Sequence, residues 1–362
     1  MSVMVREAVH VKYPPHTPLR ERLVQCVNDH FTRTAIRPEG GSRLVLKSFV
    51  VLAWWLASYV ALVFWARTWW QVVPLVISLG VSVAAIGFNI QHDGGHGSFA
   101  RKKRWNRLSA LSLDLMGGSS YFWHHKHNIL HHQYTNVDGV DDDLAAGPFL
   151  RLAEGQPRLW IHRFQHWYIW PLYTFLPIRW QLLDDFKNLA TGRIGDQPVP
   201  RPRGRDLVLL FLGKLVFATW AFVIPLSLHD PWKVILVYVA GALVTGVTLG
   251  TVFQLAHCVE EAAFAPVPPP GGRLDRSWTE HQLATTVDFA PRSRFLTWLL
   301  GGLNFQVEHH LFPRISHVHY PAIQPIVRSV CAEYGIPKLC HDTLGGALRS
   351  HVRYLKKMGR AA

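Results

Sequence analysis

Charged side chains are scarce in this sequence. Only 17% of its 362 residues are Asp, Glu, Lys or Arg, against ~25% in soluble domains, whereas 49% are hydrophobic. Fifteen tryptophans and nineteen phenylalanines accompany this deficit, and tryptophan is enriched where a protein meets the bilayer interface. The composition therefore argues against an ordinary soluble domain and favours a protein that contacts lipid.

Cysteine is also rare. The four cysteines show no CxxC spacing and are Cys26, Cys258, Cys331 and Cys340. Neither a cysteine metal site nor a disulfide framework is indicated, so we expect reduced thiols.

The chain starts with charged and polar residues up to about position 44, without the apolar core of a signal peptide. We expect the first membrane span to act as the targeting signal.

The net charge of +14 does not by itself indicate nucleic acid. The basic residues are spread over segments that flank apolar stretches, and anionic lipid headgroups explain such a distribution more simply. We therefore expect a lipid bilayer, and no nucleic acid, among the partners.

Four apolar stretches reach the ~20 residues that a helix needs to cross a bilayer. They cover residues 45–65, 72–90, 207–228 and 234–256. Short links join them into two tight hairpins, each of which enters the membrane from one side and returns to it. Lys214 is the only charge deep inside a stretch, and we expect its amine to reach the cytosolic boundary rather than to act in catalysis.

The distribution of lysine and arginine predicts the orientation. Residues 1–47 carry eight, 91–206 carry fifteen and 258–362 carry twelve, whereas each hairpin link carries one. The positive-inside rule then places both termini and the middle segment in the cytosol, at the plasma membrane if the chain is bacterial.

The chain divides into three parts. We expect a cytosolic N-terminal segment (1–44), a membrane domain (45–330) and a cytosolic C-terminal tail (331–362). Within the middle segment, residues 108–123 and the aromatic-rich residues 160–183 read as interfacial helices. The predicted fold is an all-α integral membrane protein with four transmembrane helices and a cytosolic helical cap that holds a dimetal site.

The dimetal site is predicted from histidines at the ends of the apolar stretches. These are His92 and His96, then His127, His131 and His132, then His257, and finally Gln306, His309 and His310. Residues at i and i+4 share one helix face, so His92 with His96, and His127 with His131, can meet one metal. His132 points about 100° away from His131 on a helix, toward a second metal.

Neutral imidazole is the commonest protein metal ligand, and eight or nine donors exceed what one ion takes. The alternative is that the histidines only end helices, which would explain one cluster but not three. Ligand type alone leaves zinc, copper, iron and nickel open.

Other polar residues near the clusters are candidates for orienting the ligands. They are His124, one turn before His127, and Asp141 and Asp142 of the acidic run Asp141–Asp143. The alternatives are an interfacial histidine and a solvated acidic turn that caps a helix. Glu308 lies between ligand positions, and we expect it to point away from the metals.

The clusters and their flanks resemble those of the membrane fatty acid desaturase family. The similarity rests on His92-Asp-Gly-Gly-His-Gly-Ser-Phe99, Tyr134-Thr-Asn-Val137, Phe305–Pro313 and the order of the spans, and it covers about residues 45–330. The resemblance implies a non-haem diiron centre whose ligands are the seven cluster histidines, with His257 as an additional one. Gln306 stands where many members have histidine, and its Gln-x-x-His-His form is similar to the front-end desaturases, which count the new double bond from the carboxyl end.

The implied reaction is the O2-dependent introduction of a cis double bond into an acyl chain. The chain would lie in an apolar tunnel and be carried by coenzyme A, acyl carrier protein or a lipid. Hydroxylation, acetylenation and ketolation on the same scaffold are rivals. A metal transporter is a remote alternative, because transporters place ligands near the bilayer midplane and these ligands lie at the ends of the spans.

Many eukaryotic front-end members carry a fused cytochrome b5 domain with a His-Pro-Gly-Gly signature. That signature is absent here, and residues 1–44 are too few to hold such a domain. We therefore expect electrons from a separate ferredoxin or cytochrome b5-type carrier with its own reductase.

Overall fold

Residues 11–269 and 272–361 are described by a computed structural model. Within them, four helices are long and apolar enough to cross a membrane, which confirms the predicted spans. The first, Gly41–Trp65, consists of α2 (Gly41–Val60) and η1 (Ala61–Trp65); the second, Trp69–His96, of α3 (Trp69–Ile86), η2 (Gly87–Gln91) and α4 (His92–His96). The third, Arg205–Leu226, consists of α12 (Arg205–Ala218), η8 (Thr219–Val223) and α13 (Ile224–Leu226), and the fourth is α14 (Pro231–His257).

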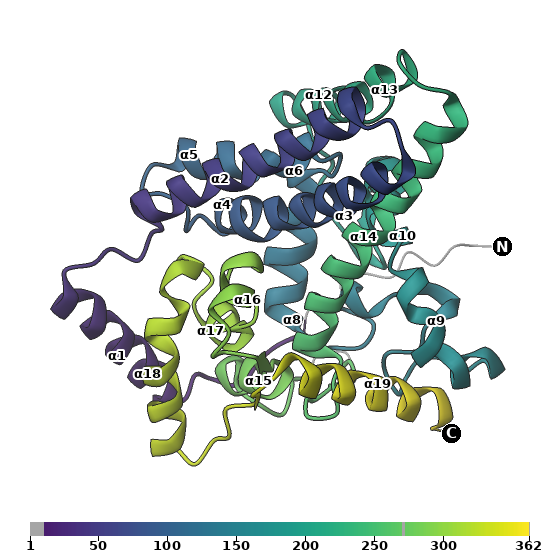
Figure 1. The fold of residues 1–362 in the computed structure, drawn as a ribbon. Helices are drawn as coiled ribbons and strands as arrows, with labels where there is room; N and C mark the ends of the chain where they lie inside the picture. The colour runs from purple at the N-terminus through teal and green to yellow at the C-terminus, as the bar shows by residue number, and fades with distance from the viewer. Residues whose placement is uncertain (1–10, 270–271, 362) are drawn as a thin grey trace.

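The second span is the centre of the helix bundle, because α3 packs along both α2 and α14 (Figure 1). It begins with a capping box in which the side chains of Thr68 and Gln71 bond each other's backbone amides. Gly80 permits the close approach of α14, since a Cβ there would lie under 3.0 Å from Val244. Thr245 adds a hydrogen bond from its hydroxyl to the Gly80 carbonyl at 3.0 Å.

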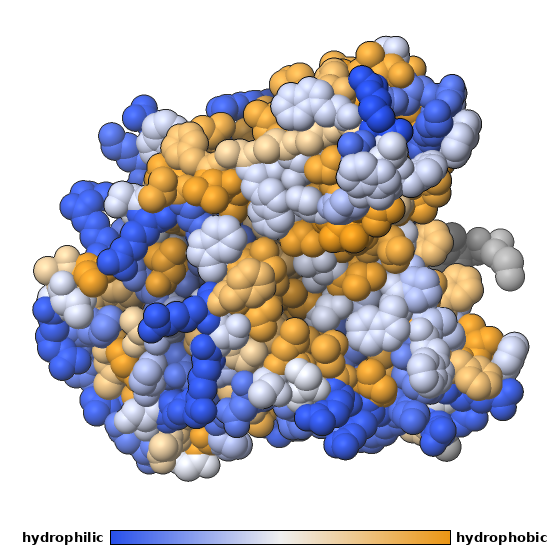
Figure 2. All heavy atoms as spheres, viewed as in Figure 1, coloured by the Kyte–Doolittle hydropathy of each residue, from blue (hydrophilic) through white to orange (hydrophobic). Residues whose placement is uncertain are grey.

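The outer surface of the spans is apolar. Leu46, Phe49, Val208, Leu215 and Ile235 are each more than half exposed. Hydrophobic residues gather over the upper part of the molecule, where the spans lie, and hydrophilic residues cover the lower and left parts (Figure 2). A continuous exposed apolar surface marks a site of contact with another phase or partner, and with four spans that phase is the bilayer.

The segment between the hairpins is a chain of short helices and one two-stranded antiparallel sheet. It contains α5 (Lys103–Ala110), α6 (Ser112–Leu115), α7 (Ser120–Trp123), η3 (His124–His131), α8 (His132–Tyr134), η4 (Asp142–Leu144), η5 (Gly147–Phe149), η6 (Trp160–Phe164), α9 (Gln165–Leu172), α10 (Phe175–Arg179), η7 (Trp180–Asp184), α11 (Asp185–Thr191), β1 (Arg193–Ile194) and β2 (Gln197–Pro198). Trp160 and Trp167 are largely exposed, as an interfacial segment requires.

Two contacts tie this segment to the spans. Gly246 of α14 lets the backbone of Tyr173 approach so closely that a Cβ would lie under 3.0 Å from it. Lys214 of α12 forms an ion pair with Asp185 at 2.6 Å and donates to two carbonyls of η7. Lys214 therefore reaches a buried carboxylate of the middle segment.

The C-terminal third completes the cap beneath the spans (Figure 1). It contains α15 (Trp278–Thr285), β3 (Asp288–Phe289), α16 (Arg294–Leu299), α17 (Gln306–Leu311), η9 (His317–His319), α18 (Tyr320–Glu333), β4 (Cys340–His341) and α19 (Leu344–Arg360), and the N-terminal helix α1 (Pro18–Thr34) packs on α18. Apart from the two short strand pairs, the described residues fit the all-α prediction. All four cysteines are free, as expected.

Residues 331–361 pack against the rest of the chain. Strand β4 pairs in parallel with β3, so that Cys340 lies opposite Asp288. On α19, His351 donates from Nδ1 to the Cys258 carbonyl at 2.7 Å. The domain boundary at 330 stays a prediction, and residues 1–10 of the N-terminal segment and residue 362 of the tail lie outside the described residues.

Candidate metal centre

Four separate pieces of chain deliver the histidines to one place. The second span ends with His92 and His96 on α4, and α14 ends with His257. Close packing at α4 requires its two glycines: a Cβ on Gly94 would lie under 3.0 Å from the backbone of α5, and one on Gly95 equally close to Trp123. Steric crowding therefore explains why both of these positions, between His92 and His96, are occupied by glycine.

His127 and His131 of the second cluster lie on a π-helix, η3, and His132 follows it directly, where the sequence predicted α-helical spacing. A π-helix bonds residue i to i+5, so His127 and His132 come to lie on the same side. Their Nε2 atoms are 3.2 Å apart. His131 stacks on His127 with ring centroids at 5.3 Å and faces the other half of the site.

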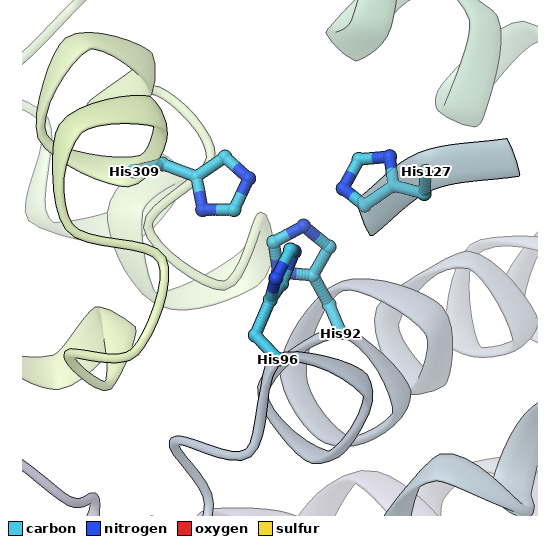
Figure 3. A group of neighbouring side chains, drawn as sticks. All are labelled: His92, His96, His127 and His309. Carbon is cyan, nitrogen blue, oxygen red and sulfur yellow. The ribbon is translucent and has the colours of Figure 1, made fainter. Parts of the chain in front are cut away.

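Four imidazoles form the first group. Ligand atoms of His92, His96, His127 and His309 all lie within 4.8 Å of one another. Figure 3 shows these rings converging from α4, from η3 and from α17 on one small space. The distance limit is compatible with one ion bound to all four nitrogens.

A second group of imidazoles lies directly beside the first. His131, His257 and His310 satisfy the same distance limit, as do His132, His309 and His310. His309 thus belongs to the first group and to the last of these sets, and His132 stacks on His310 with centroids at 4.3 Å. All eight histidines therefore form one continuous cage.

The chemistry of the donor set fits metal ions. Four buried ring nitrogens of the cage have no hydrogen-bond partner among the described residues: His96 Nε2, His132 Nδ1, His309 Nε2 and His310 Nε2. Buried polar atoms are nearly always bonded, so this concentration of free nitrogens needs an external partner.

Burial and the neighbouring imidazoles also keep the rings neutral. Both effects lower the pKa of His127, His132, His309 and His310 well below its ordinary value. A neutral ring presents the lone pair that a metal binds.

Comparison with known proteins identifies the scaffold that carries this cage. The family model described as fatty acid desaturase matches residues 67–340, which is more than half of the chain. The chain belongs to the fatty acid desaturase family. The desaturase is 40% identical over 339 residues to an acyl-lipid (8-3)-desaturase of Physcomitrium patens, covering 92% of this chain and 70% of the relative.

Two cyanobacterial relatives match along nearly their whole length. The sn-1 linoleoyl-lipid 6-desaturase of Arthrospira platensis is 36% identical over 340 residues, covering 94% of this chain and 92% of the relative. The enzyme of the same name from Synechocystis sp. is 34% identical over 360 residues, covering 98% and 99%. The desaturase is therefore an oxidoreductase that acts on fatty acyl chains, and the front-end type suggested by its Gln-x-x-His-His motif fits these relatives.

Outer ring nitrogens of the desaturase's cage are held by fixed partners. His131 Nδ1 lies 3.1 Å from Asp141 Oδ2, His310 Nδ1 is 2.9 Å from Gln282 Oε1, His309 Nδ1 is 3.1 Å from the Tyr320 hydroxyl, and His257 Nδ1 is 3.1 Å from the Thr285 carbonyl. Each contact fixes a ring's rotation and leaves Nε2 free to face inward.

Of the two acidic residues predicted to orient a ligand, one contacts a histidine and the other pairs with a lysine. Asp141 contacts His131 and also accepts the Asn136 amide at 2.9 Å. Burial lowers the pKa of His131, but the charge and hydrogen bond of Asp141 outweigh it and raise the pKa above its ordinary value. Asp142, which we expected to orient a ligand, pairs with Lys126 at 2.8 Å. Asp143 lies closer to the site, 3.4 Å from His131 Nδ1.

Two further predicted residues lie at the margin. Gln306 is buried at the start of α17, one turn before His310, and its role as a ligand stays a prediction. His124 is exposed and contacts Asn128 at 2.9 Å. Asn128 in turn donates to the Gly95 carbonyl at 2.8 Å, so His124 reaches the site only through it.

Two neighbouring cavities lie between the cage and the far end of the spans. The smaller, ≈ 60 Å³, is lined by His92 and His127 and by apolar residues of α3, α6 and α14. The larger, ≈ 440 Å³, runs to the hairpin links at the opposite end of the spans. Both share Val83, Pro177 and Gln181 in their walls. Two mostly apolar spaces with shared wall residues thus lie between the histidines and the hairpin links.

Proposed function

We propose that this desaturase holds two iron ions in its histidine cage and removes two hydrogens from adjacent methylene groups of an acyl chain. In the balanced reaction, one O2, two electrons and two protons are consumed, two water molecules form, and a cis double bond remains. Iron would supply the oxygen activation, since no side chain can attack an unactivated C–H bond. The observation that carries the proposal is the set of unpartnered, buried imidazole nitrogens at the end of an apolar cavity.

The chain's own residues position the reaction. The eight histidines hold the metals, with Gln306 as a further candidate, and Asp141, Gln282 and Tyr320 fix the orientation of ligand rings. The smaller cavity would hold the reacting methylenes against His92 and His127. The apolar walls exclude water from the site, and the larger cavity receives the methyl end of the chain.

We further propose that the substrate chain is part of a membrane lipid and that the new bond lies near the carboxyl end. The printed names of the relatives, which include acyl-lipid and linoleoyl-lipid desaturases, support this. The Lys/Arg distribution supports a cytosolic cage. There a separate ferredoxin or cytochrome b5-type carrier would deliver the electrons.

The test is expression in a host whose lipids lack the product, followed by mass spectrometry with the double bond located. A lipid with two fewer hydrogens supports desaturation. A gain of one oxygen would identify a hydroxylase, and loss of two hydrogens from an existing double bond an acetylenase. His309→Ala is the inactive control, because His309 groups with His92, His96 and His127 and also with His132 and His310. Iron uptake by the host without any altered lipid would refute the proposal in favour of transport.

A further inference from the structure

A buried cluster of charges lies directly behind the third histidine cluster. Glu308 stands on α17 between Val307 and the ligand candidate His309. The side chains of Glu308 and Asp288 have no exposed surface, and that of Lys338 is 3% exposed. Charged side chains are almost never buried this completely unless they are paired.

Lys338 joins the two carboxylates. Its ammonium group is in close contact with Asp288 Oδ2 and lies 3.2 Å from Glu308 Oε1. Asp288 also accepts the backbone amide of Val307 through Oδ1 at 3.0 Å. The cluster therefore holds α17 at two points, one on its backbone and one on a side chain.

The C-terminal segment brings the lysine to this position. Lys338 stands two residues before Cys340, and the parallel pairing of β4 with β3 sets Cys340 opposite Asp288. The approach of Lys338 to α17 thus depends on a pairing between two segments far apart in the chain.

From these contacts we infer that Lys338 is a positioning residue of the metal centre. Its charge offsets the buried carboxylates of Glu308 and Asp288 and holds α17 so that His309 and His310 face the cage. Without that charge, two carboxylates would be buried side by side, which is strongly unfavourable. The carboxylates would have to take up protons, or the helix would have to move to hydrate them. Because α17 carries His309 of the first group and His310 of the second, such a movement would weaken both metal sites.

The inference rests on the proposed metal-binding function and is tested by metal binding rather than by turnover. Lys338→Met removes the charge and keeps the length of the side chain. Lys338→Met/Glu308→Gln also removes one negative charge, so that a single buried carboxylate remains. Lys357→Met is the matched control, since Lys357 is exposed on α19. Each full-length protein is purified in detergent, shown to be monodisperse, and titrated with Co²⁺ while the visible absorption bands are recorded.

Loss of an outer-shell partner typically lowers metal affinity ~10–100-fold, and that is the expected effect of Lys338→Met. Lys338→Arg should retain most of the metal affinity. The Lys338→Met/Glu308→Gln double variant should recover the affinity together with the wild-type cobalt spectrum. Lys357→Met should bind cobalt like the wild type. If Lys338→Met does not fold, recovery of folding and binding in the double variant supports the inference.

Wild-type cobalt affinity in Lys338→Met would overturn the inference, and so would a double variant as defective as Lys338→Met. A wild-type protein that binds two metals but makes no desaturated lipid would contradict the proposed function and leave this inference standing.

Discussion

Replacing Asp141 with asparagine tests whether the second histidine cluster is tuned from outside the cage. The Asp141 side chain is 1% exposed, and its two oxygens lie 3.1 and 3.2 Å from His131 Nδ1. Asparagine has nearly the same shape and can still accept the Asn136 amide. The substitution therefore removes the charge that raises the pKa of His131 while leaving the local fold in place.

The expected loss follows from the role of such carboxylates. An outer-shell partner of a metal-bound histidine typically contributes ~10–100-fold in metal affinity, which corresponds to about 1.4–2.8 kcal/mol. We expect a loss in this range at the metal bound by His131, His257 and His310. The other metal should change less, because His131 does not belong to the group of His92, His96, His127 and His309.

The assay is a competition between the purified protein and a calibrated chelator for Fe²⁺, with iron measured per chain. Asp142→Asn is the control: Asp142 is the next residue, but it pairs with Lys126 and not with a histidine. If Asp141→Asn and Asp142→Asn retain iron equally well, the assignment of Asp141 is wrong.

Three other substitutions have defined outcomes. Gly241 lines the larger cavity, and a Cβ there meets nothing within 4 Å. Gly241→Phe should therefore fold, and in a competition between substrates of different chain length its products should shift toward shorter acyl chains. An unchanged ratio of short to long products would mean that the acyl chain does not lie there. Lys214→Met leaves Asp185 buried without its partner and should lower the unfolding free energy by about 3–5 kcal/mol, measured by thermal unfolding in detergent. Arg107→Met, which breaks a largely exposed pair, should change the unfolding free energy by about 0–1 kcal/mol. Gly246→Ala should destabilise by about 1–3 kcal/mol through overpacking against Tyr173, and Gly241→Ala, with open space around it, should not. Equal unfolding temperatures of the two variants would count against the contact between Tyr173 and α14.

The spans were predictable because burial in lipid leaves a local signature. The apolar stretches coincide with the four long helices, which begin a few residues earlier, at Gly41, Trp69, Arg205 and Pro231. Helices extend beyond the hydrocarbon region, and hydropathy registers only the part inside it. For the same reason, the second membrane span continues through polar residues to His96.

The candidate ligands were predictable, but their partners were not. Imidazoles at regular spacing stand out in a sequence, whereas Gln282, Thr285 and Tyr320 are single polar residues that only the tertiary fold brings beside the rings. Asp143 was visible in the acidic run, but the choice among three neighbouring carboxylates depends on the local turn. Lys338 had no signal at all, because its partners lie on other segments.

The helix type of the second cluster was not predictable either. Spacing rules assume α-helical geometry, and the π-helix of η3 changes which rings meet. His127 with His132, five positions apart, becomes the close pair. A local backbone choice thus decides how the ligands are divided between the two halves of the cage.

Because the rings converge from four pieces of chain, the proposed metals would be part of the protein's tertiary scaffold. Any species that binds only the folded state stabilises it by mass action, and here the bound ions would tie the ends of α4 and α14 to η3 and α17. Exposure to a strong chelator should therefore loosen the junction between spans and cap as well as stop catalysis. Heat resistance measured on stripped protein would understate that of the loaded enzyme.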